Sequence, residues 1–135
     1  MVSVLFLLSS CVPPATAVAG SVITISAEDL YADYVKDQAT ADAKYRGRTL
    51  EVTGEVIVSR AVIFVDKYYI ILNGNTKDTS NQWGIQCAFN NTLDEKVNAV
   101  EKHEVATIKG RGDGMEEDVV LGDCELIKVV PKPGG

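Results

Sequence analysis

The chain has 135 residues, of which 46% are hydrophobic and 24% are charged, so it is long enough for one domain with a buried core. Acidic residues outnumber basic residues by 19 to 13, giving a formal net charge of −6, and this excess opposes nonspecific binding to nucleic-acid phosphates. The first 27 residues contain no charged side chain, which sets the N-terminal segment apart from the rest.

The N-terminal segment has the pattern of a bacterial export signal. An apolar run over residues 2–8 is too short to cross a bilayer and leads into Leu8-Ser9-Ser10-Cys11, which resembles a lipobox, the site at which a cysteine is lipidated. We therefore expect residues 1–25 to be an export or lipoprotein signal followed by a linker, with Cys11 as the lipidated residue. The lipid would anchor the protein in the bacterial cell envelope, facing the periplasm or the cell surface.

Two other interpretations of the same segment remain open. The small residues Ala17-Val18-Ala19 fit the cleavage site of an ordinary signal peptide. A disordered apolar tail without a targeting role is the third interpretation. The Lys or Arg that usually precedes the apolar run of a signal is absent from Met1-Val2-Ser3, which counts against the lipobox.

The cysteine count is compatible with export. Lipidation of Cys11 would leave Cys87 and Cys124 as the remaining pair, and an exported domain could oxidise them to a disulfide. Each also lies among apolar residues at alternating spacing, which fits two buried thiols that act as small hydrophobic side chains. Both interpretations stay open, because the sequence does not show whether the two side chains meet.

The first predicted element is a helix from Ser26 to Tyr45. Ser26 suits the N-cap, and Asp29 in the first turn suits the positive end of the helix dipole. Leu30 and Tyr34 begin a stripe at helical spacing that predicts one packed face. Gly47 then ends the helix.

A long alternating strand follows the helix. Leu50, Val52, Val56 and Val58 share one face with Gly54 among them, which predicts a half-buried strand. A glycine on the buried face indicates a bend or the close approach of another backbone.

The rest of the chain predicts four more strands and a short helix. These are strands at residues 68–72, 83–89, 104–110 and 119–130 and a helix at residues 92–100. The turn before the second strand falls either at residues 59–61 or near residues 66–67.

This order predicts an all-β fold, a five-stranded OB barrel with an N-terminal helix and a short helix between its third and fourth strands. Five motifs occur along the chain: Ala41-x-x-x-Tyr45-x-Gly47, Leu50-x-Val52-x-Gly54-x-Val56, Gln86-Cys87-x-Phe89, Val105-x-x-Ile108-x-Gly110 and Leu121-x-x-Cys124-x-Leu126. Together they resemble the tRNA_anti-like family of OB-fold domains. The resemblance covers about residues 30–130 and implies an OB domain. From the helix start at Ser26 and the Pro/Gly-rich ending, we place this domain at residues 26–131, followed by a disordered tail at residues 132–135. Members of this family are commonly small bacterial proteins, often with an export or lipoprotein signal.

The sequence offers no catalytic or metal-binding set. His103 is the sole histidine, no C-x-x-C pair is present, and no nucleophile can be assigned with a base. The acidic residues Asp113, Glu116, Glu117 and Asp118 could attract a hard cation, but a solvated turn fits their spacing better. We therefore predict a non-catalytic protein with no metal and no cofactor.

An OB fold usually binds ligands on its second and third strands and on the loops that join strands one to two and four to five. This rule selects Arg60, Lys67, Tyr68, Tyr69 and Trp83 as candidate ligand residues. Trp83 also shares the face of Ile85, Cys87 and Phe89, which favours core packing for its ring. Aromatic rings with flanking cations can stack on single-stranded bases, although the acidic turn between strands four and five repels phosphates. Our leading hypothesis is a module that binds a protein, a peptide or an envelope ligand, and single-stranded nucleic acid is the alternative.

Overall fold

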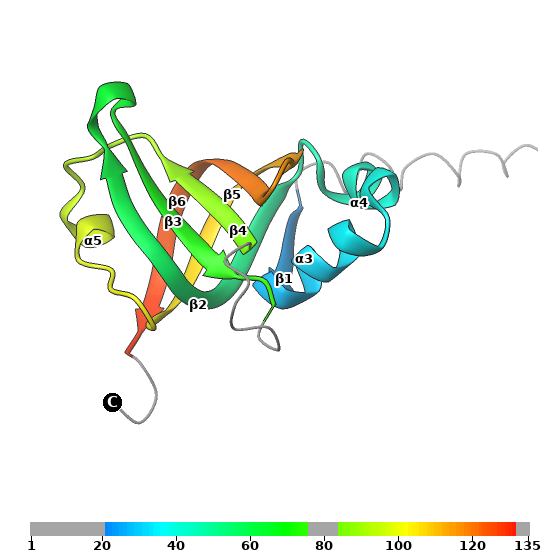
Figure 1. Cartoon of the computed structure of the whole chain (residues 1–135), viewed down its shortest axis with the longest axis horizontal. Coiled ribbons are helices and arrows are strands. Elements are labelled where there is room, and N and C mark those ends of the chain that lie inside the picture. Colours follow the sequence, from blue (N-terminus) through cyan, green and yellow to red (C-terminus); the bar gives the residue numbers. More distant parts are fainter. Residues whose placement is uncertain (1–20, 76–83, 132–135) are drawn as a thin grey trace, which may run out of the picture.

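The computed structural model describes residues 21–75 and 84–131 (Figure 1). The described strands are β1 (Val22–Ser26), β2 (Thr49–Val62), β3 (Lys67–Asn73), β4 (Gly84–Phe89), β5 (Val105–Met115) and β6 (Val119–Val130). The described helices are α3 (Ala27–Lys36), α4 (Gln38–Tyr45) and α5 (Glu95–Asn98), and a 3-10 turn, η2 (Ile63–Val65), follows β2. Cys11, Trp83 and the expected tail at residues 132–135 lie outside the described residues.

The strands form a sheet that closes on itself. Their order in the described part of the chain is β1-β2-β3-β4-β6-β5, and β5 pairs back onto β2. The barrel pairs are antiparallel except for β4 and β6, which run parallel. A closed five-stranded barrel of this order, with α5 between its third and fourth strands, is an OB fold, which confirms the predicted fold class.

β2 is long because it belongs to both halves of the barrel. Residues 49–55 pair with β5 and residues 56–62 pair with β3, and the ribbon curves between the two halves (Figure 1). Gly54 lies at this change of partner. A Cβ there would be 2.7 Å from the Cβ of Ala27 and 3.2 Å from the Cβ of Leu72, so the glycine leaves room for the start of α3.

The side chains of β2 change faces near Ile57. Val56 pairs with Leu72 and Val58 pairs with Ile71, so β2 carries one more residue than β3 at this point. A β-bulge of this kind reverses which side chains face the interior. The prediction that Val58 shares the buried face of Val56 was therefore wrong: Val58 is half-buried and lies beside Ile71 on the outer surface.

The predicted N-terminal helix is two helices. Asp37 separates α3 from α4 with an extended backbone, at φ −162° and ψ 101°, and its side chain caps α4 by accepting a hydrogen bond from the Thr40 N–H. The short polar side chain of Asp competes with the helical backbone for hydrogen bonds, so one continuous helix does not form. Among the described helices, none has the length and apolar composition needed to span a bilayer.

Residues 22–25, expected to belong to the linker, are part of the sheet. β1 pairs in parallel with β2, with Val22 opposite Thr49 and Ser26 opposite Thr53. Ser26 is also the N-cap of α3, as predicted, because its hydroxyl accepts a hydrogen bond from the Asp29 N–H. The sheet therefore includes residues that precede Ser26.

The helices and the barrel share one hydrophobic core. Helices α3 and α4 lie at one end of the molecule and α5 lies at the other (Figure 1). The helical side chains buried in this core are Ala27, Leu30, Tyr34, Ala41, Tyr45 and Val97. The barrel is thus packed from both ends, and its possible contact surfaces are the outer faces of the strands and the loops.

Candidate ligand face of the barrel

One row of predicted ligand residues lies together on the outer face of three strands. Arg60 on β2 pairs with Tyr69 on β3, and Tyr69 pairs with Ala88 on β4. Arg60 is exposed and Tyr69 is half-buried. Within the described ranges the Arg60 side chain has no ion pair or hydrogen bond, so its charge is available to a ligand.

Tyr68, by contrast, lies on the opposite face of β3 from Tyr69. It points into the barrel, 8% exposed, and its hydroxyl lies 2.7 Å from the Ser59 hydroxyl. Neighbouring residues of a strand face opposite sides, so the pair Tyr68 and Tyr69 supplies one aromatic ring to the surface and one to the core. The candidate role of Trp83 stays a prediction.

A chain of polar contacts crosses the same side of the barrel. The Lys67 ammonium donates to the Asn90 carbonyl oxygen, the Asn90 amide donates to Asp123 at 2.6 Å, and Arg111 donates to the other Asp123 oxygen at 2.5 Å. The hydrogen bond from Asn90, followed by the bond and charge of Arg111, holds the pKa of Asp123 below its usual value. Lys67 is therefore engaged with the protein itself.

This chain of contacts was not predicted from the sequence. Asn90, Arg111 and Asp123 come from different elements and are far apart in the sequence. No motif links them, and the barrel pairing alone brings them together.

The acidic turn between β5 and β6 is less exposed than predicted. Asp118 is buried, and its carboxylate accepts a hydrogen bond of 2.7 Å from the Gly84 N–H at the start of β4. Burial is the main cause that raises the pKa of this carboxyl. Asp113 is held by Arg111 in a two-bond ion pair. Asp118 is thus a structural residue, and the expectation that it belongs to a solvated turn was wrong.

His103 joins β2 to the loop before β5. The imidazole Nδ1 of His103 lies 3.0 Å from a carboxylate oxygen of Glu55. The backbone N–H of His103 donates a hydrogen bond to the Val56 carbonyl. The part of the chain that the structure describes contains no group of three or more His, Cys, Asp or Glu side chains able to hold a metal ion. The contacts of His103 therefore support a structural role.

Two loops at one end of the barrel carry an exposed apolar surface. The β2–β3 loop spans residues 63–66, which agrees with the later of the two predicted turn positions. In this loop Phe64 is fully exposed and Val65 is 55% exposed. In the β4–α5 loop, residues 90–94, Leu93 is 82% exposed. The Thr92 hydroxyl donates to Asp66 at 2.8 Å, which ties the two loops together. We call Phe64, Val65 and Leu93 the apolar tip.

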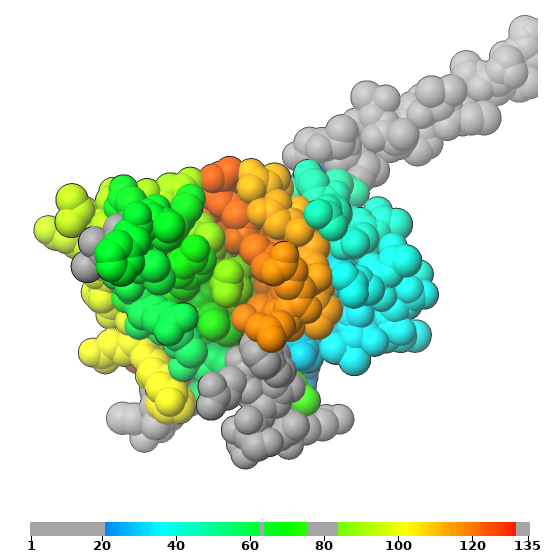
Figure 2. Space-filling view, turned by 45° about the horizontal axis from the view of Figure 1, so that its top comes forward, coloured from blue at the N-terminus to red at the C-terminus, as the bar shows by residue number. Residues whose placement is uncertain are grey.

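The apolar tip lies away from helices α3 and α4. Figure 2 shows the β2–β3 loop (green) and the following loop (yellow-green) on the side of the molecule opposite α3 and α4 (cyan). The sequence analysis missed this surface, because the run of apolar residues from 61 to 65 has the composition of a buried strand. Three large apolar side chains exposed on two hydrogen-bonded loops form a candidate interaction surface.

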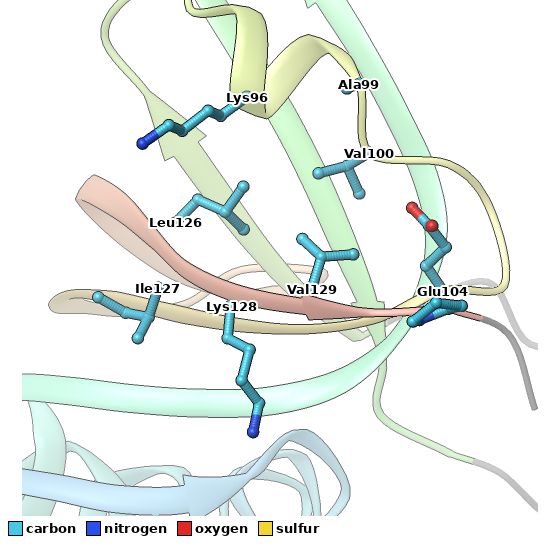
Figure 3. Close-up of a pocket in the computed structure, with 9 residues that line it drawn as sticks. Lys96, Ala99, Val100, Glu104, Leu126, Ile127, Lys128 and Val129 are labelled. Atoms are coloured by element: carbon cyan, nitrogen blue, oxygen red, sulfur yellow. The ribbon is translucent and has the colours of Figure 1, made fainter.

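A groove of about 480 Å³ lies between α5 and the second half of β6. Leu126 and Val129 point from β6 toward Val100, with Lys96 near one end and Glu104 near the other (Figure 3). The groove exists because β6 pairs with β4 only as far as Leu121. It is apolar along its floor and charged at its ends.

The closed barrel, with α5 between its third and fourth strands, defines an OB-fold domain. The chain belongs to the tRNA_anti-like family, whose family model matches residues 9–126, and the resemblance seen in the sequence motifs is thereby confirmed. Among curated proteins, none matches the sequence.

Two solved structures illustrate the fold similarity. A crystal structure named as a "putative nucleic acid-binding lipoprotein" from Klebsiella pneumoniae subsp. pneumoniae superposes with a TM-score of 0.63 at 21% identity, over 86% of this chain and 99% of the other. A "putative aspartyl-tRNA synthetase" from Leishmania major Friedlin superposes with a TM-score of 0.49 at 12% identity, over 80% of this chain and 20% of the other. At 21% identity the likeness to the Klebsiella protein concerns the fold.

Proposed function

We propose that this protein is an exported, lipid-anchored and non-catalytic OB-fold module that binds a protein or peptide of the cell envelope. The observation that carries the proposal is the apolar tip. The side chains of Phe64 and Leu93 are largely exposed, and they lie on two loops that a hydrogen bond links. Large apolar side chains in this position lose exposed area on binding a partner, which favours association.

The charges around the outer face favour a protein ligand over nucleic acid. Three basic residues in this region are accompanied by three acidic residues. The basic residues are Arg60, Lys67 and Arg111, and the acidic residues are Asp66, Asp113 and Asp123. Two of the carboxylates are paired with Arg111, and Glu116 and Glu117 in the β5–β6 turn add negative charge. Single-stranded nucleic-acid sites need a positive groove along the backbone, and this balance supplies none.

The binding role is tested by photocrosslinking in the native host. Phe64 is replaced by benzoylphenylalanine, and Val35 on α3, 63% exposed, is replaced in a matched control on the helical side. We expect a discrete protein adduct from position 64 that disappears when Leu93→Ser is added. Equal adducts from both positions, no adduct, or adducts with phospholipid alone would contradict a protein ligand.

The anchor is tested separately. The supporting observations are the tetrapeptide Leu8-Ser9-Ser10-Cys11 and the name of the Klebsiella protein as a lipoprotein. Labelling with a palmitate analogue is expected in the unmutated protein and lost in Cys11→Ser. An unlabelled native protein would refute the anchor and leave the binding role standing.

A second candidate function is single-stranded nucleic-acid binding. It is favoured by the cross-strand neighbours Arg60 and Tyr69 and by the name of the Klebsiella protein. Fluorescence anisotropy with labelled oligonucleotides at low salt distinguishes the two candidates. Micromolar binding that weakens with salt and with Tyr69→Ala would place this candidate first, whereas absence of binding is expected for a protein-binding module.

A further inference from the structure

Cys87 and Cys124 meet at the seam where β4 and β6 separate. Residues 85–87 of β4 pair with residues 119–121 of β6, and Cys87 with Leu121 is the last of these pairs. Beyond it, no described strand pairs with the edge of β6 that faces β4. The barrel wall is therefore weakest just after these two residues.

A distortion of β6 brings Cys124 back toward this point. The pairing of β6 with β5 shifts here, and Asp123 has a φ of 49°, which are the marks of a β-bulge. The Cys124 sulfur lies 3.4 Å from the carbonyl oxygen of Leu121. It also fills the space that a side chain on Gly110 would need, because a Cβ there would be 2.7 Å from the sulfur.

The Cys87 side chain faces the same space from the other strand. It is fully buried, and Cys87 pairs with Leu121, whose carbonyl oxygen lies 3.4 Å from the Cys124 sulfur. Burial, and then the nearby Cys124 thiol, raise the pKa of Cys87 well above its usual value. Cys124 is half-buried and therefore closer to solvent. Both are free thiols in this structure.

We propose that Cys87 and Cys124 are a redox pair that forms an intramolecular disulfide across the seam between β4 and β6. The bond would tie the two strands together where their backbone pairing ends. This inference is independent of the ligand and of the lipid anchor, because it depends on the packing of two thiols inside the barrel.

The oxidant belongs to the class of disulfide-bonded thiol compounds, which react by thiol–disulfide exchange. Cys124 is nearer the solvent and attacks first as the thiolate, forming a mixed disulfide and expelling one thiol of the oxidant. The Cys87 thiolate then attacks the Cys124 sulfur and expels the second thiol. Two electrons pass to the oxidant, and the two protons of the cysteines end on its two thiols.

The test uses the full chain with Cys11→Ser, so that these two cysteines remain. The reduced protein is refolded from urea in a glutathione redox buffer, acid-quenched, alkylated and weighed, and the same incubation is made in urea. Refolding exposes both thiols to the oxidant, so burial cannot hide them. We expect the equilibrium constant for the intramolecular disulfide to be about tenfold or more higher in the folded protein than in urea, with peptide mapping that joins residues 87 and 124.

Two single variants serve as controls. Cys87→Ser and Cys124→Ser, each combined with Cys11→Ser, must lose the disulfide and remain monomeric. Equal constants with and without urea, or glutathione adducts on both cysteines in place of the disulfide, would overturn the proposal. Circular dichroism of the reduced protein in buffer confirms that the folded state was tested.

Discussion

Gly54 is a residue at which α3 packs closely against the barrel. A Cβ at this position would be 2.7 Å from Ala27 and 3.2 Å from Leu72, and both neighbours are buried. The glycine that the sequence analysis linked to a bend thus has a second role, which is to admit the first turn of α3.

Gly54→Val should therefore lower the free energy of unfolding by about 1–3 kcal/mol, as overpacking does. Urea unfolding measures this loss, and adding Ala27→Gly should recover part of it by removing the nearest clashing methyl group. Glu51→Val, at a half-buried position of the same strand, is the matched control for introducing a valine. An unchanged urea midpoint for Gly54→Val would show that the close approach is absent.

Asp118 links the β5–β6 turn to the start of β4 by a single hydrogen bond to the Gly84 N–H. Asp118→Ala leaves that buried N–H without an acceptor, and the expected loss of stability is about 1–3 kcal/mol. Asp118→Asn keeps an oxygen at the same place and should lose much less. Equal losses in the two variants would mean that the hydrogen bond does not stabilise the fold.

The same residue predicts a pH dependence. Its folded-state pKa is raised above the usual 3.8, so the stability it contributes is fully present below pH 3.8 and is lost as the pH rises through the raised value. Asn carries no titratable proton. As the pH rises from 3.5 to 7, Asp118→Asn should therefore become more stable relative to the unmutated protein. Urea titrations across this range check the sign, and a constant difference would contradict it.

At the scale of elements, α3 and α4 are held together by two crossed hydrogen bonds. The Tyr34 hydroxyl of α3 donates to Asp42 of α4 at 2.9 Å, and the Tyr45 hydroxyl of α4 donates to Asp33 of α3 at 2.5 Å. Burial, followed by these bonds, raises the pKa of both tyrosines, so both donate throughout the physiological range. The break at Asp37 is thus compensated by side-chain bonds across it.

Tyr34→Phe and Tyr45→Phe should each destabilise the protein by about 1 kcal/mol, the usual net value of such a bond. Thermal or urea unfolding measures the effect. Tyr31→Phe is the control, since Tyr31 lies on α3 and its ring packs against Gly74 without a hydroxyl partner among the described residues. A similar loss in Tyr31→Phe would assign the effect to the rings and not to the hydrogen bonds.

Strands were predictable from the sequence wherever apolar and polar residues alternate without interruption. The barrel strands and their order follow from such patterns, as β5 and β6 show. The outer face was harder, because the bulge near Ile57 exchanges inside and outside without any change in composition. The adjacent rings of Tyr68 and Tyr69 were both taken as surface residues, although a strand can present only one of them. The apolar tip was not predicted, because the composition of a segment does not show whether its apolar residues are exposed or buried.

For the whole molecule, the main asymmetry is between its two ends. At the end near the β5–β6 turn, Gln38 of α4 donates to the Met115 carbonyl at 3.0 Å, so the helices cover a turn that commonly borders the ligand site of an OB fold. At the other end the β2–β3 loop is exposed with Phe64 at its tip. Ligand contact is therefore expected at the β2–β3 side, which agrees with the proposed role of the apolar tip.

The shared core also predicts how the molecule unfolds. Leu30 and Tyr34 of α3 belong to the same buried cluster as Leu72 and Ile85 of the barrel, so the helices should not melt while the barrel persists. We expect one cooperative transition, with far-UV dichroism for the backbone and near-UV dichroism for the tyrosines following one urea curve, as for a two-state domain. Leu30→Ala should shift both curves together and cost about 2–5 kcal/mol, whereas Val35→Ala, on the exposed side of the same helix, should move neither. Two separate transitions in the far-UV curve would mean that α3 and α4 unfold as a separate unit.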